Sequence, residues 1–124
     1  MDRDRVRTGR DSETLAAAYL QNHGLEILER NVRCPLGEVD LVARDGRTYV
    51  FVEIRSQRSD RRGAAEESVG PEKRKRVVRV AMWYLKRFGL ERVPVRFDVV
   101  AVRWRGHEAQ VRWIPGAFDA HGAG

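Results

Sequence analysis

The stretch GEVDLVARDGRTYVFVEIRSQ, from Gly37 to Gln57, contains two largely apolar runs separated by Asp45-Gly46. Apolar runs of this length that are rich in Val, Phe and Tyr predict β-strands, and a short turn with glycine between them predicts a hairpin. Three acids, Glu38, Asp40 and Glu53, interrupt the two predicted strands. The hairpin therefore defines the centre of the fold and also carries its most unusual side chains.

The register of this hairpin decides which acids face each other. If Asp45 and Gly46 are the two turn residues, Asp40 lies opposite Phe51 and diagonal to Glu53, with the two backbones roughly 7–8 Å apart. A turn of four residues shifts the pairing by two residues and places Asp40 directly opposite Glu53. Both registers leave the acids on one face, because a shift of two residues preserves the side to which each side chain points.

Two interpretations of this acidic face remain open. Like charges this close repel each other, so a cation or a shared proton would offset the repulsion, and oxygen ligands favour Mg²⁺ or Mn²⁺. In the other interpretation the face is exposed, and Glu38, Asp40, Glu53 and Arg55 form ordinary cross-strand ion pairs.

The rest of the chain predicts helices and strands on either side of the hairpin. A helix is expected from Asp11 or Ser12, either of which could be its N-cap, to residue 22. Pro71 and an apolar i, i+3, i+4 pattern predict a long helix that ends at Gly89. Further strands are expected at residues 25–33, 95–104 and 109–114. The resulting order, α-β-β-β-α-β-β, predicts an α/β fold with a mixed sheet flanked by helices.

The length predicts one domain. The chain has 124 residues, 42% of them hydrophobic, which is enough for a single core. We expect residues 1–10 to form a flexible charged arm, residues 11–118 to form the domain, and residues 119–124 to form a disordered tail. Residues 57–70 are polar and rich in arginine, which predicts a mobile loop.

The charge predicts a polyanionic partner. The formal net charge is +6 and the isoelectric point is about 10.2, so nucleic acid is the expected partner. The single cysteine, Cys34, and the lack of a long apolar run favour a cytoplasmic protein outside the membrane. The cations expected to contact a phosphate backbone lie in the loop and on the long helix: Arg58, Arg61, Arg62, Lys75, Arg79 and Lys86.

Several of these motifs together resemble a known family. Glu13, the stretch Gly37 to Gln57, RFDVVAV at 96–102 and the closing IPGAF are similar to the YraN-type family of small, uncharacterised bacterial proteins. The resemblance covers residues 9–118. It implies a restriction-endonuclease-like, PD-(D/E)xK fold related to archaeal Holliday-junction resolvases.

The resemblance also implies a role for particular residues. Asp40 would bind a bridging metal ion, Glu53 would be the acid of the E-x-K element, and Glu13 would be an additional metal ligand from the first helix. The position of the pattern's lysine is occupied by Arg55. Arginine stays protonated at any working pH, so Arg55 could supply charge to a phosphate but could not accept a proton.

The expected function is therefore that of a Mg²⁺- or Mn²⁺-dependent endonuclease that hydrolyses phosphodiester bonds of DNA, either branched or damaged. Its catalytic residues would be Glu13, Asp40, Glu53 and Arg55, with the three acids at the metal. A nucleic-acid-binding protein that has lost turnover through Arg55 is the alternative, and a scaffold for an acidic protein partner is a third. Analogy with resolvases suggests a homodimer. For Asp98, a buried scaffold pair with an arginine is preferred over a catalytic role.

Overall fold

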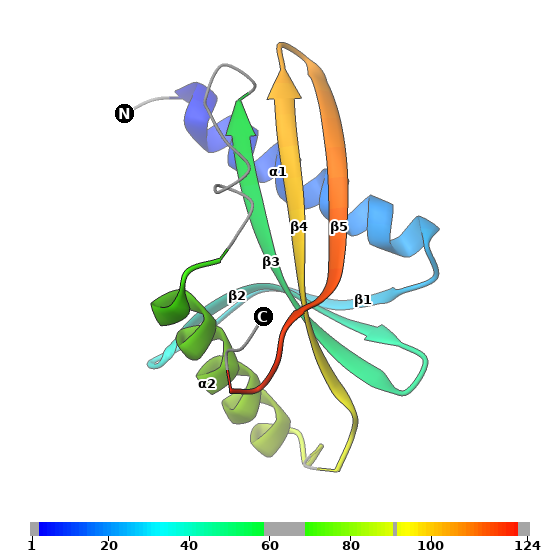
Figure 1. Ribbon diagram of the computed structural model, residues 1–124, viewed down its shortest axis with the longest axis vertical. Coiled ribbons are helices and arrows are strands. Elements are labelled where there is room, and N and C mark those ends of the chain that lie inside the picture. The colour runs from blue at the N-terminus through cyan, green and yellow to red at the C-terminus, as the bar shows by residue number, and fades with distance from the viewer. Residues whose placement is uncertain (1–2, 59–68, 91, 122–124) are drawn as a thin grey trace.

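The computed structural model describes residues 3–58, 69–90 and 92–121. It has two helices and five strands in the predicted order (Figure 1). The elements are α1 (Arg3–Asn22), β1 (Glu26–Cys34), β2 (Gly37–Asp45), β3 (Thr48–Arg58), α2 (Pro71–Arg87), β4 (Val95–Arg105) and β5 (Glu108–Phe118). The predicted α/β class and element order are confirmed.

The five strands form one mixed sheet in the order β1-β2-β3-β4-β5. Three neighbouring pairs are antiparallel, and β3 and β4 are parallel. A parallel pair needs a long crossover connection, and α2 lies in this one. Figure 1 shows α1 and α2 on opposite faces of the sheet. The sheet is therefore the middle layer of three.

Each helix packs on its own face of the sheet. Ala16, Ala17 and Leu20 of α1 pack against β-strand residues that include Val52 and Val100. The small alanines let this helix approach closely. On the other face, buried residues of α2 pack against Val42, Phe51, Phe97 and Val99. Side chains alternate between the faces along each strand, so each central strand contributes to both cores.

The expected beginning of the first helix is wrong. The helix α1 begins at Arg3, so it includes residues 3–10, which the sequence assigned to a segment before the helix. Ser12 is not a cap. Its buried hydroxyl is 2.7 Å from the Ser56 hydroxyl and accepts a hydrogen bond from Trp104 Nε1 at 2.8 Å. Because tertiary partners satisfy this hydroxyl, it does not compete with the helical backbone.

The hairpin has the second of the two registers considered. Leu41 pairs with Val52 and Asp45 pairs with Thr48, which leaves Gly46 and Arg47 as the turn residues. A turn at Asp45-Gly46 is therefore wrong. Gly46 has a φ of 61°, a conformation that glycine adopts without strain at the first position of a type II′ turn.

Parts of the predicted loop and tail lie outside the described residues. Of the loop expected at residues 57–70, strand β3 includes Gln57 and Arg58, and residues 59–68 are not described. Residues 119–121 follow β5, and the His121 N–H donates to Asp119 Oδ1 at 2.9 Å. Neither described helix is long and apolar enough to span a membrane.

Candidate active site

Asp40 and Glu53 meet on neighbouring strands. The paired part of β2 and β3 ends at Leu41 and Val52, and Asp40 and Glu53 are the next residues along the two strands. Their side chains are close enough to interact. Asp40 is half-buried, and its Oδ2 accepts a hydrogen bond from the Ile54 N–H at 2.8 Å. Glu53 is 2% exposed. The acid expected from the E-x-K pattern is thus an interior residue beside a second carboxylate.

A lysine that the sequence analysis missed contacts this pair. Lys73 Nζ lies 3.1 Å from Glu53 Oε2, and the Lys73 side chain is 40% exposed. Lys73 is in the first turn of α2, and only the packing of that helix on the sheet brings it to Glu53. Its one sequence signal is its place just after Pro71, where the predicted helix begins.

Gly37 lies at the beginning of β2, next to α2. A Cβ atom at Gly37 would be 3.4 Å from Val80 Cγ2 and 3.9 Å from Arg76 Cβ, which are ordinary contact distances. The φ of this residue is 142°, a conformation in which a side chain would be strained. The backbone conformation, and not the space beside the helix, therefore favours glycine here.

Burial and mutual repulsion make both carboxyl groups hard to ionise. Burial is the main cause that raises the pKa of Glu53 from 4.5 to about 7, and the Asp40 charge raises it further, against the lowering effect of Lys73. The pKa of Asp40 is also raised, chiefly by burial, although the Ile54 N–H and Lys73 oppose this. Near neutral pH the pair therefore binds a proton that two exposed carboxylates would have lost.

This shared proton predicts an unusual pH dependence of stability. In EDTA, the contribution of Glu53 to the free energy of unfolding should fall as the pH rises from 4.5 to about 7. The folded state binds more protons than the unfolded state across this window, so ionisation favours unfolding. The expected loss is on the order of 3 kcal/mol. Urea unfolding at a series of pH values, with Glu53→Gln as the control, measures it. An identical pH dependence in both proteins would contradict the prediction.

Glu13 and Glu38 lie near the pair without joining it. Each carboxylate raises the pKa of Asp40 through its charge. Glu13 Oε2 accepts a hydrogen bond from Asn31 Nδ2 at 3.3 Å. Glu38 forms an exposed ion pair with Arg33 at 3.1 Å. For Glu38, the ordinary cross-strand ion pair is therefore the observed arrangement.

Arg55 is on the same face as Glu53, two residues further along β3, and is half-buried. Side chains two residues apart in a strand point the same way, with their Cα atoms about 6.5–7 Å apart. Across the described residues, no group of three or more His, Cys, Asp or Glu side chains is arranged to hold a metal ion. A metal at this site would therefore depend on the two carboxylates, with water or substrate as its other ligands.

The cations expected to bind nucleic acid are only partly described. Arg61 and Arg62 lie outside the described residues. Arg58 is exposed at the end of β3, and the exposed α2 stripe consists of Lys75, Arg79 and Lys86. These exposed positions leave the three side chains of the stripe accessible to a nucleic acid.

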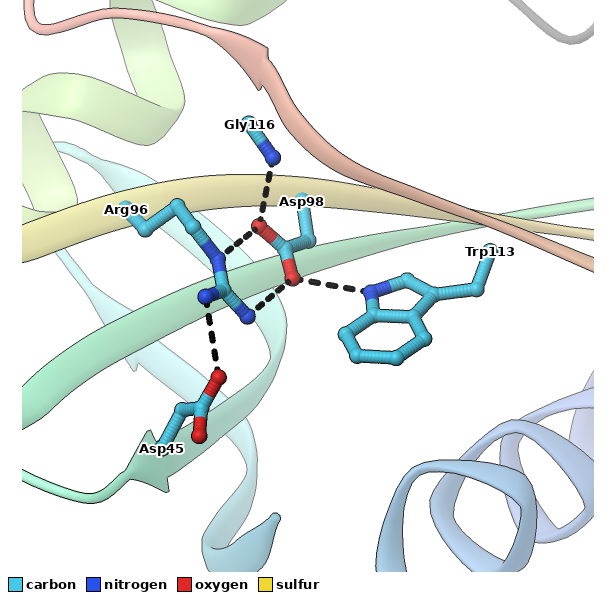
Figure 2. A network of polar contacts seen from close by, with 5 residues as sticks. All are labelled: Asp45, Arg96, Asp98, Trp113 and Gly116. Carbon is cyan, nitrogen blue, oxygen red and sulfur yellow. Dashed lines mark hydrogen bonds and ion pairs between the residues drawn. The ribbon is translucent and has the colours of Figure 1, made fainter. Parts of the chain in front are cut away.

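The other buried acid belongs to the scaffold. Asp98 is 0% exposed and accepts two hydrogen bonds from Arg96, at 2.9 and 3.0 Å (Figure 2). Trp113 Nε1 and the Gly116 N–H also donate to it, at 2.8 and 3.0 Å. Arg96 Nη1 also donates a hydrogen bond to Asp45 Oδ2 at 3.0 Å. The preferred scaffold role for Asp98 is confirmed, since this network ties β4 to β5 and to the hairpin.

Comparison with known proteins identifies the family. The sequence model of the uncharacterised protein family UPF0102 matches residues 12–102. A UPF0102 protein of Syntrophotalea carbinolica is 47% identical over 98% of this chain and 99% of its own length. One from Anaeromyxobacter dehalogenans is 51% identical over 95% of this chain and 88% of its own. One from Moorella thermoacetica is 47% identical over 95% of this chain and 100% of its own. The chain therefore belongs to the UPF0102 family.

Proposed function

We propose that this protein is a metal-dependent nuclease with a restriction-endonuclease-like, PD-(D/E)xK fold related to that of Holliday-junction resolvases. The observation that carries the proposal is the meeting of Asp40, Glu53 and Lys73 on one face of the sheet. Two carboxylates and a cation are the residue types that phosphodiester hydrolysis with a metal ion requires.

The donor set fits a hard divalent ion. Mg²⁺ is commonly held by one or two carboxylates, with water and substrate phosphate as its remaining ligands. Asp40 and Glu53 would hold it, and Glu13 would add negative charge nearby from α1. A bound ion would lower the pKa of a coordinated water and offset negative charge on the phosphate. A dication would also relieve the repulsion that raises the pKa of both carboxyl groups.

The cationic role would belong to Lys73 and Arg55 together. Lys73 contacts Glu53 directly and favours the ionised carboxylate that a metal ion needs. Arg55 lies further along the same strand and could bind a phosphate through two parallel N–H donors. A lysine from the helix therefore compensates for the missing lysine of the E-x-K element.

The direct test is cleavage of labelled four-way-junction, flap, single-stranded and linear DNA, with Mg²⁺, with Mn²⁺ and in EDTA. Metal-dependent cleavage by the native protein would support the proposal, and the preferred structure among the four would indicate the substrate class. Failure of every substrate to be cleaved under all conditions would contradict it. Light scattering of the same preparation tests the homodimer expected from resolvases.

Binding without turnover is the second candidate function. It is favoured by Arg55 at the lysine position, because arginine stays protonated and cannot accept a proton. The Arg55→Lys variant separates the two candidates. Salt-sensitive DNA binding by an inactive native protein, with cleavage gained in Arg55→Lys, would establish a binding protein on a nuclease fold.

Lys73→Met is expected to lower the cleavage rate on the order of 10²-fold, because it removes a positive charge next to the reacting groups. It should also weaken Mg²⁺ binding at neutral pH, since the pKa of Glu53 rises further when Lys73 no longer opposes it. Calorimetric Mg²⁺ titrations at pH 6 and pH 8.5 measure this second effect, which should be larger at pH 6.

Arg87→Met is the matched control, because it removes the same charge from an exposed position on the same helix, outside the expected nucleic-acid-binding set. Native cleavage and native Mg²⁺ affinity are expected in this variant. Equal losses in the Lys73 and Arg87 variants would show that Lys73 acts only through the general charge of the helix.

A further inference from the structure

A hollow on the sheet surface lies apart from the acid pair. Its volume is about 390 Å³, and its lining residues are Ala101, Arg103, Gln110, Val111 and Arg112. Ala101 pairs with Arg112 and Arg103 pairs with Gln110 across β4 and β5, so these four side chains share one face. Val100 and Val102 alternate with them and pack on the α1 side. The hollow is therefore on the face opposite α1.

The strand register aligns this hollow with the candidate active site. Glu53 pairs with Val99 and Arg55 pairs with Ala101 along the parallel strands β3 and β4. Arg55, Ala101 and Arg112 thus form one row across three strands, about 10 Å wide at the backbone. On the same face of the sheet, this row is adjacent to the row that contains Glu53 and Val99. A polymer that passes over the acid pair could continue into the hollow.

The hollow exists because a small side chain lies between long ones. Ala101 is 6% exposed, and its neighbours in the row are both arginines. The helix α2 packs on the rows that contain Phe97 and Val99. Figure 1 shows β3, β4 and β5 extending beyond α2. The sheet beyond the helix therefore presents polar side chains around a shallow depression.

The chemistry of the lining suits a phosphodiester. Among the described residues that line it, two are arginines, one is a glutamine and none is a carboxylate. Arginine binds phosphate through parallel N–H donors, and glutamine adds a neutral donor. Arg103 and Arg112 also interact with other groups of the protein. Each guanidinium has five N–H donors, so it can keep such a contact and still bind an anion.

We propose that this arginine hollow binds a backbone phosphate of a nucleic-acid strand, next to the phosphate that lies at Asp40 and Glu53. The inference rests on the proposed function, because that function places the neighbouring phosphate at Asp40 and Glu53. The binding of nucleic acid by the hollow can be tested without any cleavage.

The test compares two double variants that lose the same charge. Arg103→Gln/Arg112→Gln changes the hollow. Arg47→Gln/Arg92→Gln changes exposed arginines near the opposite end of the sheet, where Tyr49 pairs with Val95. Fluorescence anisotropy in EDTA measures the binding of a labelled single-stranded DNA 20-mer across a range of salt concentrations. Unlabelled RNA, DNA and inorganic phosphate serve as competitors.

The hollow variant should raise the Kd at least tenfold. It should reduce the slope of log K against log salt by about 0.7, the value for one lost phosphate contact to a single strand. The control should change the Kd by no more than about twofold. Competition by DNA or RNA at strand concentrations near the Kd would support a backbone site, and equal competition by micromolar inorganic phosphate would overturn it. Equal weakening of DNA binding in the two double variants would also overturn it, and so would unchanged DNA binding in both.

Two further measurements separate the possible failures. The single variant Arg112→Gln changes an exposed side chain and should give about half of the change in salt slope if the double variant does not fold. Loss of binding in the hollow variant supports the hollow even if the native protein cleaves no substrate. Cleavage by the native protein, with unchanged binding in the hollow variant, would reject the hollow and leave the proposed nuclease function intact.

Discussion

The Arg96→Met variant is expected to lose about 3–5 kcal/mol of its unfolding free energy. Arg96 is the cationic partner of Asp98, whose carboxylate is 0% exposed. Methionine fills a similar volume but leaves that charge inside the protein with only the neutral donors of Trp113 and Gly116. Since a domain of this size is stabilised by about 5–15 kcal/mol in total, much of the margin would be lost.

Urea unfolding measures the loss, and two variants show its origin. Arg44→Met breaks the exposed pair between Arg44 and Glu26, whose side chains are 41% and 58% exposed, and should cost under about 1 kcal/mol. Arg96→Met/Asp98→Asn should be more stable than Arg96→Met alone, because the buried charge is gone. If Arg96→Met lowers the unfolding free energy no more than Arg44→Met does, the hydrogen-bond network around Asp98 does not contribute the expected stability.

The Asp40→Asn variant is expected to lose metal-dependent cleavage by a factor on the order of 10³, because it removes one of the two carboxylates that would hold the charge-stabilising metal ion. Asparagine keeps an oxygen that can accept the Ile54 N–H, so the local backbone should keep its hydrogen bond. What the variant removes is the second carboxylate of the pair. Single-turnover cleavage and calorimetric Mg²⁺ titration both measure the loss.

The same substitution should make the metal-free protein more stable at neutral pH. The Asp40 charge raises the pKa of Glu53, so its removal lets Glu53 ionise at lower cost in the folded state. A gain in stability together with a loss of activity is typical of residues kept for function.

Glu38→Gln is the matched control for Asp40→Asn, because Glu38 is a nearby acid on the same strand that is exposed and paired with Arg33. This control should keep native cleavage and native Mg²⁺ affinity. Cleavage by Asp40→Asn at the native rate would contradict the proposed site. Equal losses in both variants would show that only the total negative charge of the strand matters.

The helix after Pro71 and the strands of the hairpin could be predicted from local sequence patterns. The helix after Pro71 and the alternation along the hairpin were predictable because their periods match those of a helix and a strand. The beginning of α1 was not predictable in this way. Ser12 has the chemistry of a cap, but it lies inside the helix, where its hydroxyl bonds to Ser56 and Trp104 of distant strands.

The sequence by itself determined the family, the order of the elements and the placing of Asp40 and Glu53 on one face, because side-chain parity along a strand survives a two-residue shift. The tertiary structure decided what those acids meet. Lys73 reaches Glu53 because α2 crosses from β3 to β4 and packs on the sheet. The arginine hollow lies beside the acid pair because parallel pairing aligns Arg55 with Ala101, one of the lining residues of the hollow. Such contacts join residues far apart in the chain, so no local period records them.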